Sequence, residues 1–175
     1  VLTGFNDTVD GTANFDDWSV DAGAGDDSII LGAGNDTITA GGGNDTIIGG
    51  EGSDLYFGGL GDDEIYLAGG DTAEGGDGDD LFILSDLSGS TGDISVIGGE
   101  GGETNGDTLN LSGLADMSTL VITDPDDVNG GLSGTIDLLD GSGTVSFQNI
   151  ENMIICFTPG ARIMTPRGER RIEEL

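Results

Sequence analysis

The chain has 175 residues, of which 34 are acidic and 4 are basic, and its formal net charge is −30. It contains no His, which excludes a Ser-His-Asp triad, a Cys-His dyad and a zincin motif within these residues. So much negative charge repels nucleic acid and anionic lipid, and no apolar run reaches the roughly 18 residues of a membrane span. A divalent cation is the partner that this composition favours.

The charge distribution divides the chain. All four basic residues lie between Arg162 and Arg171, so residues 1–155 carry 31 carboxylates and neither Lys nor Arg. This segment cannot neutralise its own charge through ion pairs, whereas an ordinary domain mixes both signs. We therefore expect a domain boundary near residue 155.

A nine-residue repeat fills the first half of the chain. Loose copies surround Asp7 and Asp17, and clear copies cover residues 22–83. These read AGAGDDSII, LGAGNDTIT, AGGGNDTII, GGEGSDLYF and GGLGDDEIY, then the shortened LAGGDTAE and the full GGDGDDLFI. The consensus is G-G-x-G-x-D-x-U-x, where U is apolar.

The repeat predicts a coiled β structure. Glycines at the second and fourth positions tolerate positive φ in a tight turn, and the apolar eighth residue points inward from a three-residue strand. Two repeats make one coil of about 18 residues, and alternate strands then build two facing parallel sheets. The expected fold is all-β, a right-handed parallel β-roll over residues 1–111.

The nonapeptide resembles the RTX, or haemolysin-type, calcium-binding repeat, for which this consensus is a known signature. The resemblance implies an RTX β-solenoid that binds several Ca²⁺ ions. It also implies a secreted or cell-surface protein, exported by a bacterial route of the type I kind.

The spacing of the aspartates predicts where the ions bind. Asp27 and Asp45, like Asp36 and Asp54, are 18 residues apart, or one coil, whereas Asp17 and Asp36 are 19 apart. An ion between stacked turns, which lie about 4.7–4.9 Å apart, can reach oxygens of both at the 2.3–2.6 Å that calcium prefers. The expected carboxylate ligands are Asp17, Asp27, Asp36, Asp45, Asp54, Asp63, Asp71, Asp80 and Asp107. Turn carbonyls complete the set, from Gly25, Gly34, Gly43, Gly52, Gly61 and Gly78.

Folding and calcium binding are expected to be coupled, because stacked carboxylates repel one another unless a cation separates them. The alternative is a β-solenoid whose aspartates only solvate the turns. Solvation alone does not require Gly and Asp at fixed offsets, so we favour calcium.

Beyond Ile83 the period breaks, but strand-like runs continue. Asp93 and Asp107 precede such runs and are expected to extend the two rows of aspartates. Residues 112–155 contain LVIT, GTIDLL, GTVSF and IENMII, which we expect to form a β cap on the C-terminal end of the roll.

The ninth residues of alternate repeats predict an apolar stripe on an outer face: Ile30, Ile48, Tyr66 and Ile83. The stripe suggests a protein contact or self-assembly. Scattered exposed apolar residues in strands of high β propensity are an equally good explanation.

The last 20 residues, 156–175, begin with Cys156 and continue FTPGARIMTPRGERRIEEL. They resemble the first block of Hint domains, the hedgehog/intein self-processing family. The resemblance implies the first strands of a Hint-like β domain, with Cys156 as the nucleophile that attacks the carbonyl of Ile155. A buried structural Cys is the alternative. The family's chemistry needs a later His that is absent here, so we expect an incomplete Hint domain and no turnover from these residues.

Three functions follow from these observations. The leading one is a calcium-binding module of a secreted protein that folds on calcium outside the cell, upstream of a self-processing domain. A second makes autocatalytic cleavage before Cys156 the main activity. A third makes the chain a structural or adhesive element of a cell surface.

Overall fold

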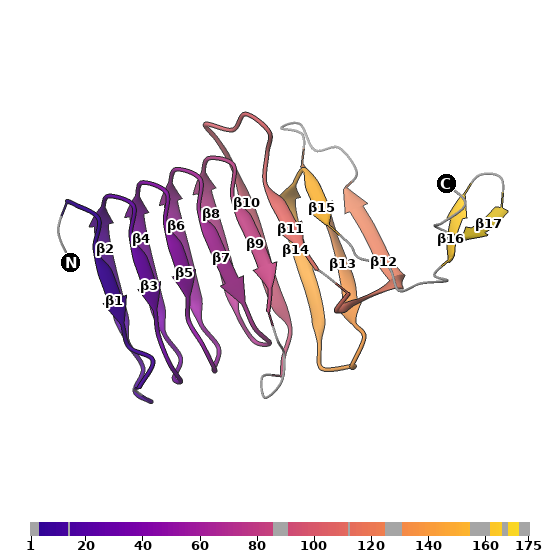
Figure 1. The fold of residues 1–175 in the computed structure, drawn as a ribbon. Helices are drawn as coiled ribbons and strands as arrows, with labels where there is room; N and C mark the ends of the chain where they lie inside the picture. Colours follow the sequence, from indigo (N-terminus) through magenta and orange to yellow (C-terminus); the bar gives the residue numbers. More distant parts are fainter. Residues whose placement is uncertain are drawn as a thin grey trace.

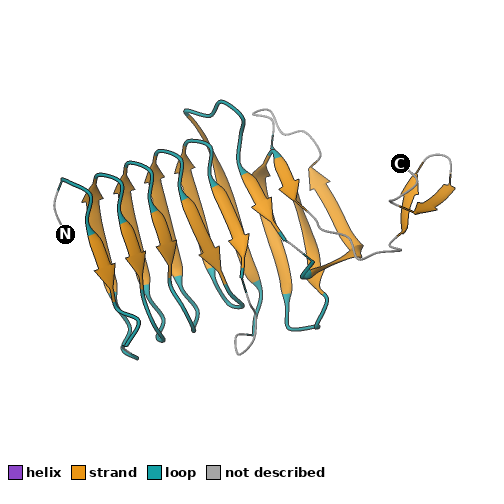
Figure 2. Ribbon diagram, in the orientation of Figure 1, coloured by secondary structure: helices purple, strands orange, loops and turns teal. Residues whose placement is uncertain are grey.

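The structure is a computed structural model that describes residues 4–13, 15–85, 91–111, 113–124, 131–154, 162–165 and 168–171. Its regular elements in these ranges are all β-strands, which follow one another in a stack of flattened coils (Figures 1 and 2). The all-β fold with parallel sheets is thereby confirmed for the repeat region.

One sheet collects the odd-numbered strands of the coils, which run parallel in the order β1-β3-β5-β7-β9-β11-β15. Their bounds are β1 Thr8–Asp10, β3 Ser28–Ile30, β5 Thr46–Ile48, β7 Glu64–Leu67, β9 Leu81–Leu84, β11 Thr108–Asn110 and β15 Asn152–Ile154.

The second sheet collects the even-numbered strands, in the order β12-β13-β14-β10-β8-β6-β4-β2. Their bounds are β2 Ser19–Ala24, β4 Thr37–Gly42, β6 Leu55–Leu60, β8 Thr72–Asp77, β10 Ile94–Gly101, β12 Ala115–Asp124, β13 Leu132–Leu138 and β14 Thr144–Ile150.

The core lies between the two sheets, because the eighth residue of each repeat points inward from both. Ile29, Ile47 and Ile65 pair in one register row of the odd sheet, and all three are completely buried. In the even sheet Ile38 pairs with Tyr56, and both are equally buried. The 18-residue period therefore sets the strand register, since a one-residue slip would turn these side chains outward.

Strand lengths differ from the expectation of three residues in every repeat. The strands β2, β4, β6 and β8 each span six residues. Pairing in the even sheet continues through the glycines that follow the strand, as where Gly41 pairs with Gly59. A glycine backbone has the same donor and acceptor as any other residue, so the ladder extends into a segment that the pattern reads as turn.

The sheets continue beyond residue 111. The strand β14 pairs in parallel with β10, and β15 pairs in parallel with β11, so each adds to one sheet of the roll. The strands β13 and β12 then extend the even sheet in antiparallel fashion. These are the strands expected between residues 112 and 155; their role as a cap stays a prediction.

The expected strand at residues 162–165 is present as β16 (Arg162–Thr165), which pairs with β17 (Gly168–Arg171) in an antiparallel hairpin. Cys156 and the bond before it lie outside the described residues. The Hint resemblance therefore gains no structural test.

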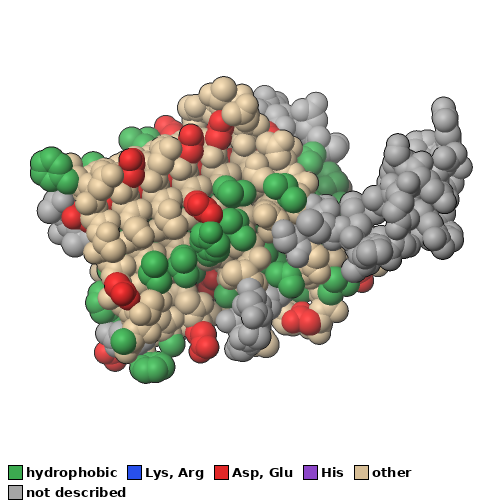
Figure 3. Space-filling view, in the orientation of Figure 1, with side chains coloured by type: hydrophobic (Ala, Val, Ile, Leu, Met, Phe, Trp, Pro, Cys, Tyr) green, Lys and Arg blue, Asp and Glu red, His purple; other side chains and the backbone are tan. Residues whose placement is uncertain are grey.

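The predicted apolar stripe forms one register row. Ile30 pairs with Ile48, Ile48 with Tyr66, and Tyr66 with Ile83, on the outer face of the odd sheet. All four side chains are partly exposed. This face is turned to the viewer in Figure 3, where hydrophobic side chains gather over the middle strands. A contact through this row stays a prediction.

The turns depend on glycine at the fourth position of the repeat. Gly43 has a φ of 124°, and a Cβ there would collide with the carbonyl oxygen of Gly25, one coil earlier. Gly61 and Gly78 have the same relation to Gly43 and Gly61. The fourth-position glycines all have positive φ: Gly25, Gly34, Gly43, Gly52, Gly61 and Gly78. Positive φ at this position is therefore confirmed, and successive turn carbonyls stack closely because no Cβ separates them.

We expect Gly43→Ala to lower the free energy of unfolding by about 2 kcal/mol or more, because Ala disfavours this φ and its Cβ meets backbone. Urea unfolding in calcium-containing buffer measures the change.

Gly42→Ala is the matched control. Its φ is not in the left-handed region, and the nearest atoms to its Cβ lie 3.9 Å away on Leu60. Its effect should stay within about 0.5 kcal/mol of zero or be slightly stabilising. Equal losses for the two variants would contradict the special role of the fourth position.

Candidate metal centre

The turns at one end of the strands carry a column of buried aspartates. These turns join each even strand to the next odd strand, and they lie along the top of the molecule as drawn in Figure 1; we call them the upper edge. Asp27, Asp45, Asp63, Asp80 and Asp107 follow one another there, and at most 3 % of the surface of each is exposed. We call them the inner column.

Hydrogen bonds connect each member of the inner column to the next. The backbone N–H of Asp27 donates to Oδ1 of Asp45 at 2.7 Å, and that of Asp45 donates to Oδ1 of Asp63 at 2.8 Å. Asp63 N bonds Asp80 at 2.9 Å, and Asp80 N bonds Asp107 at 2.8 Å. The predicted relation of one coil between these aspartates is confirmed, and Asp107 continues the column as expected.

The second oxygen of each inner-column carboxylate has no partner. Oδ2 is buried and makes no hydrogen bond in Asp27, Asp45, Asp63, Asp80 and Asp107. A buried carboxylate oxygen without a donor is costly, and residues 1–155 hold no Lys or Arg that could reach it. An oxygen-seeking cation satisfies such atoms, so the residues present fit calcium.

A second column lies on the outer side of the same turns, at the fifth position of the repeat. Here the hydrogen bonds run the other way: Asn44 N donates to Asp26 Oδ1, and Asp62 N donates to Asn44 Oδ1. Asp79 accepts from Asp62's successor turn, through the N–H groups of Thr104 and Asn105. These side chains hold adjacent turns together and remain mostly exposed. Sequence reasoning missed them because Asn, Asp and Ser alternate at this position.

The turns at the opposite end, the lower edge, differ chemically. Asp36, Asp54 and Asp71 form a column there, and Asp36 N and Asp54 N donate to the next Oδ1 at 2.8 and 2.9 Å. The buried hydroxyl of Tyr56, however, lies 3.1 Å from Oδ2 of Asp54 and 3.0 Å from Oδ2 of Asp71. Ala68 N also donates to Asp71 Oδ2. One hydroxyl hydrogen is thus shared between two carboxylates that have no such partner at the upper edge.

Two aspartates lie one residue before the expected position. Trp18 N donates to Asp36 Oδ1, so Trp18 occupies the sixth position of its turn, and Asp17 accepts from Asn35 N in the outer register. Asp93 likewise accepts from Thr144 N. Both aspartates are exposed. The 19-residue gap between Asp17 and Asp36 signalled the shift for the first of them.

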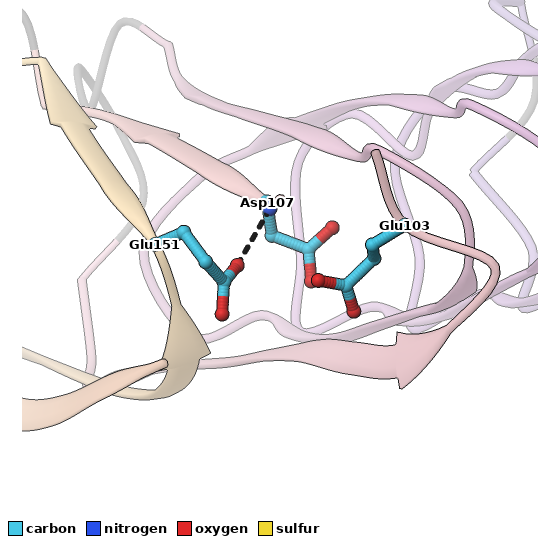
Figure 4. Close-up of side chains that lie close together, drawn as sticks. All are labelled: Glu103, Asp107 and Glu151. Carbon is cyan, nitrogen blue, oxygen red and sulfur yellow. Dashed lines mark hydrogen bonds between the residues drawn. The ribbon is translucent and has the colours of Figure 1, made fainter. Parts of the chain in front are cut away.

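Two further acidic residues lie at the end of the inner column. Glu103, Asp107 and Glu151 each offer a carboxylate oxygen within 4.8 Å of the others (Figure 4). Neither glutamate belongs to a nonapeptide, so no sequence signal pointed to them. Asp7 was also missed as a rung, although its N–H donates to Asp27 Oδ1 at 2.7 Å.

The electrostatics of the columns follow from burial. Desolvation raises the pKa of Asp63 and Asp107 to about 8, and neighbouring carboxylates add to the rise. Desolvation raises the pKa of Asp45, Asp71 and Asp80 to about 6. In each case a backbone N–H bond opposes the change without cancelling it.

Comparison with known families agrees with this geometry. The family model of the RTX calcium-binding nonapeptide repeat, which holds four copies, matches residues 3–38, 14–47 and 32–65. Residues 3–65 carry RTX calcium-binding repeats. The match includes the loose copies around Asp7 and Asp17 and ends before the units of Asp71 and Asp80. Among curated proteins, none matches the chain. In the described residues, no helix is long and apolar enough to cross a membrane.

We expect Tyr56→Phe to lower the free energy of unfolding by about 1–3 kcal/mol, because it removes the shared hydroxyl from two buried carboxylates. Thermal or urea unfolding of the calcium-saturated protein measures this. Tyr66→Phe is the control, since its hydroxyl bonds Glu64 on the outer face, and its effect should be below about 0.5 kcal/mol. A neutral Tyr56→Phe would show that the lower edge does not need the hydroxyl.

The metal-free protein should become less stable as the pH rises from 5 to 8.5. The folded pKa values of Asp45, Asp63, Asp80 and Asp107 lie above the usual Asp value of about 3.9, so the folded state binds protons more tightly. Their stabilisation is complete below about pH 4 and is lost as the pH rises through about 6 to 8.

Urea midpoints of protein stripped of metal on a chelating resin, taken across this range, test the sign. Asp79, whose pKa backbone N–H groups of Asn105, Thr104 and Gly106 lower to about 2, titrates below the window and does not interfere. A stability that is flat or rises with pH would contradict the desolvation of the inner column.

Proposed function

We propose that the roll is a calcium-binding module that folds when calcium binds outside the cell, as part of a secreted protein. The observation that carries the proposal is the row of buried, unpartnered Oδ2 atoms along the upper edge. The RTX repeats of residues 3–65 support calcium as the ion.

The inner column and the turn carbonyls would hold the ions. Aspartate Oδ2 atoms and the stacked fourth-position carbonyls of Gly25, Gly43 and Gly61 are hard oxygen ligands, which calcium prefers. Calcium tolerates irregular sets of 6–8 oxygens, whereas magnesium demands near-octahedral geometry at about 2.0–2.1 Å. A repeated turn with carboxylates on one side and carbonyls on another suits the more tolerant ion.

Charge repulsion supports coupled folding. Strand pairing brings the inner-column carboxylates one coil apart, and two unit charges about 5 Å apart repel by roughly 0.8 kcal/mol in water and several-fold more near a protein surface. Adding coils adds both repulsion and apolar burial. A divalent cation between turns converts the repulsion into attraction, so the fold and the ion depend on each other.

The site of action follows from affinity. Extracellular calcium modules bind with a Kd of roughly 10⁻⁴–10⁻³ M, far above cytosolic calcium. Such a module stays unfolded in the producing cell and folds after export, which agrees with a repeat family typical of secreted bacterial proteins. The same composition holds a single Cys and therefore no internal disulfide, so ions take the stabilising role.

Self-processing before Cys156 stays a hypothesis of the sequence, as does a surface contact through the apolar row. The register of Ile30, Ile48, Tyr66 and Ile83 favours the contact, because it makes a continuous apolar strip on an acidic molecule.

The test is a calcium titration of metal-free protein, followed by circular dichroism for β content and by fluorescence of Trp18, the only Trp. We expect both signals to change together with calcium and not with magnesium at equal ionic strength. Asp63→Asn keeps the hydrogen-bond acceptor but removes a ligand charge, and should raise the calcium midpoint about tenfold.

Asp21→Asn is the matched control, because Asp21 is exposed on the outer face of β2 and loses the same unit of charge. Equal β content with and without calcium would end the coupled-folding proposal. Equal shifts for Asp63→Asn and Asp21→Asn would mean that net charge, and not the inner column, governs the response.

A further inference from the structure

The inner column does not end at Asp107. The backbone N–H of Asp107 donates to Oε2 of Glu151 at 2.7 Å, just as the N–H of Asp80 donates to Asp107. Asn152 N in turn donates to the carbonyl of Asp107 at 2.9 Å, as the residue after each aspartate does along the column. Glu151, 44 residues after Asp107, therefore occupies the next rung.

Three separate segments meet at this rung. Glu103 comes from the turn between β10 and β11, Asp107 directly precedes β11, and Glu151 lies between β14 and β15. Each offers one carboxylate oxygen, and the three oxygens lie within 4.8 Å of one another. Figure 4 shows the carboxyl group of Asp107 between those of the two glutamates.

A second observation points to a ligand. Asp107 is completely buried, and its Oδ2 has no hydrogen-bond partner. Three carboxylates at this separation carry up to three negative charges, and residues 1–155 contain no Lys or Arg to balance them. A buried acidic group of this kind is stable only with a cation.

We propose that Glu103, Asp107 and Glu151 form a terminal calcium site that ties the last coil of the roll to β14 and β15. Oxygens up to 4.8 Å apart fit around one ion with ligands at about 2.3–2.6 Å, while the shorter 2.0–2.1 Å of magnesium brings ligands closer together. The site differs from those of the repeats, because two of its three carboxylates lie outside any nonapeptide. It relies on the proposed function only for the identity of the ion.

The test compares Glu103→Gln, Glu151→Gln and the double variant with Glu74→Gln, an exposed glutamate on β8. Gln at position 151 can still accept the hydrogen bond from Asp107 N, so the variants remove charge and not the rung. Bound calcium is counted by equilibrium dialysis, and hydrogen exchange is followed in β15 and in β5 with and without calcium.

We expect the double variant to bind one calcium ion fewer than the wild type. Calcium should no longer protect the amides of β15 in that variant, while its protection of β5 is retained. Glu74→Gln should behave as wild type in both measurements.

An unchanged calcium count with unchanged protection of β15 would overturn the terminal site and leave the proposed function standing. A wild-type protein that binds no calcium would overturn both. Should the double variant fail to fold, Glu103→Gln decides, because Glu103 lies in a turn outside the strand pairing: a full calcium count in this single variant counts against the site.

Discussion

Strand pairing and charge accumulation are inseparable in this molecule. The register that stacks Ile29, Ile47 and Ile65 in the core also stacks Asp27, Asp45 and Asp63 at the upper edge, two residues earlier on the same strands. A backbone N–H fixes one oxygen of each carboxylate, so the side chains cannot swing apart to reduce repulsion. Because residues 1–155 contain no basic side chain, the counter-charge must come from solution. The rest of the structure depends on that requirement.

The two edges meet the requirement differently. At the upper edge, the second oxygens of the column remain unpartnered and available to an ion. At the lower edge, Tyr56 replaces the smaller eighth residue and delivers a hydroxyl to Asp54 and Asp71. A side chain of the core thus does part of the work of a cation at one rung. The chain therefore combines a calcium-dependent edge with an edge that is partly satisfied from within.

The periodic part of the fold could be predicted from the sequence because its information is local. A spacing of 18 residues sets the register, and the apolar eighth residue sets the inward face, so the pairing of Ile38 with Tyr56 follows directly. Where the period fails, so does the prediction. The extra residue before Asp36 moved Trp18 into the position expected for Asp17. The six-residue even strands were missed because glycine segments read as turns, although their backbones pair.

Glu151 marks the limit of that approach and also explains how the column ends. No period connects it to Asp107, and only the parallel pairing of β15 with β11 brings it to the upper edge. Glycines make room for the longer side chain: a Cβ at Gly106 would collide with Glu151, and one at Gly131 would lie 2.7 Å from its Oε1. A solenoid must end without exposing a sheet edge that invites further pairing. A final carboxylate supplied by the strands that follow the repeats lets the column of charges end inside the protein, where the same kind of ion can bind both the last coil and the strands that cover it.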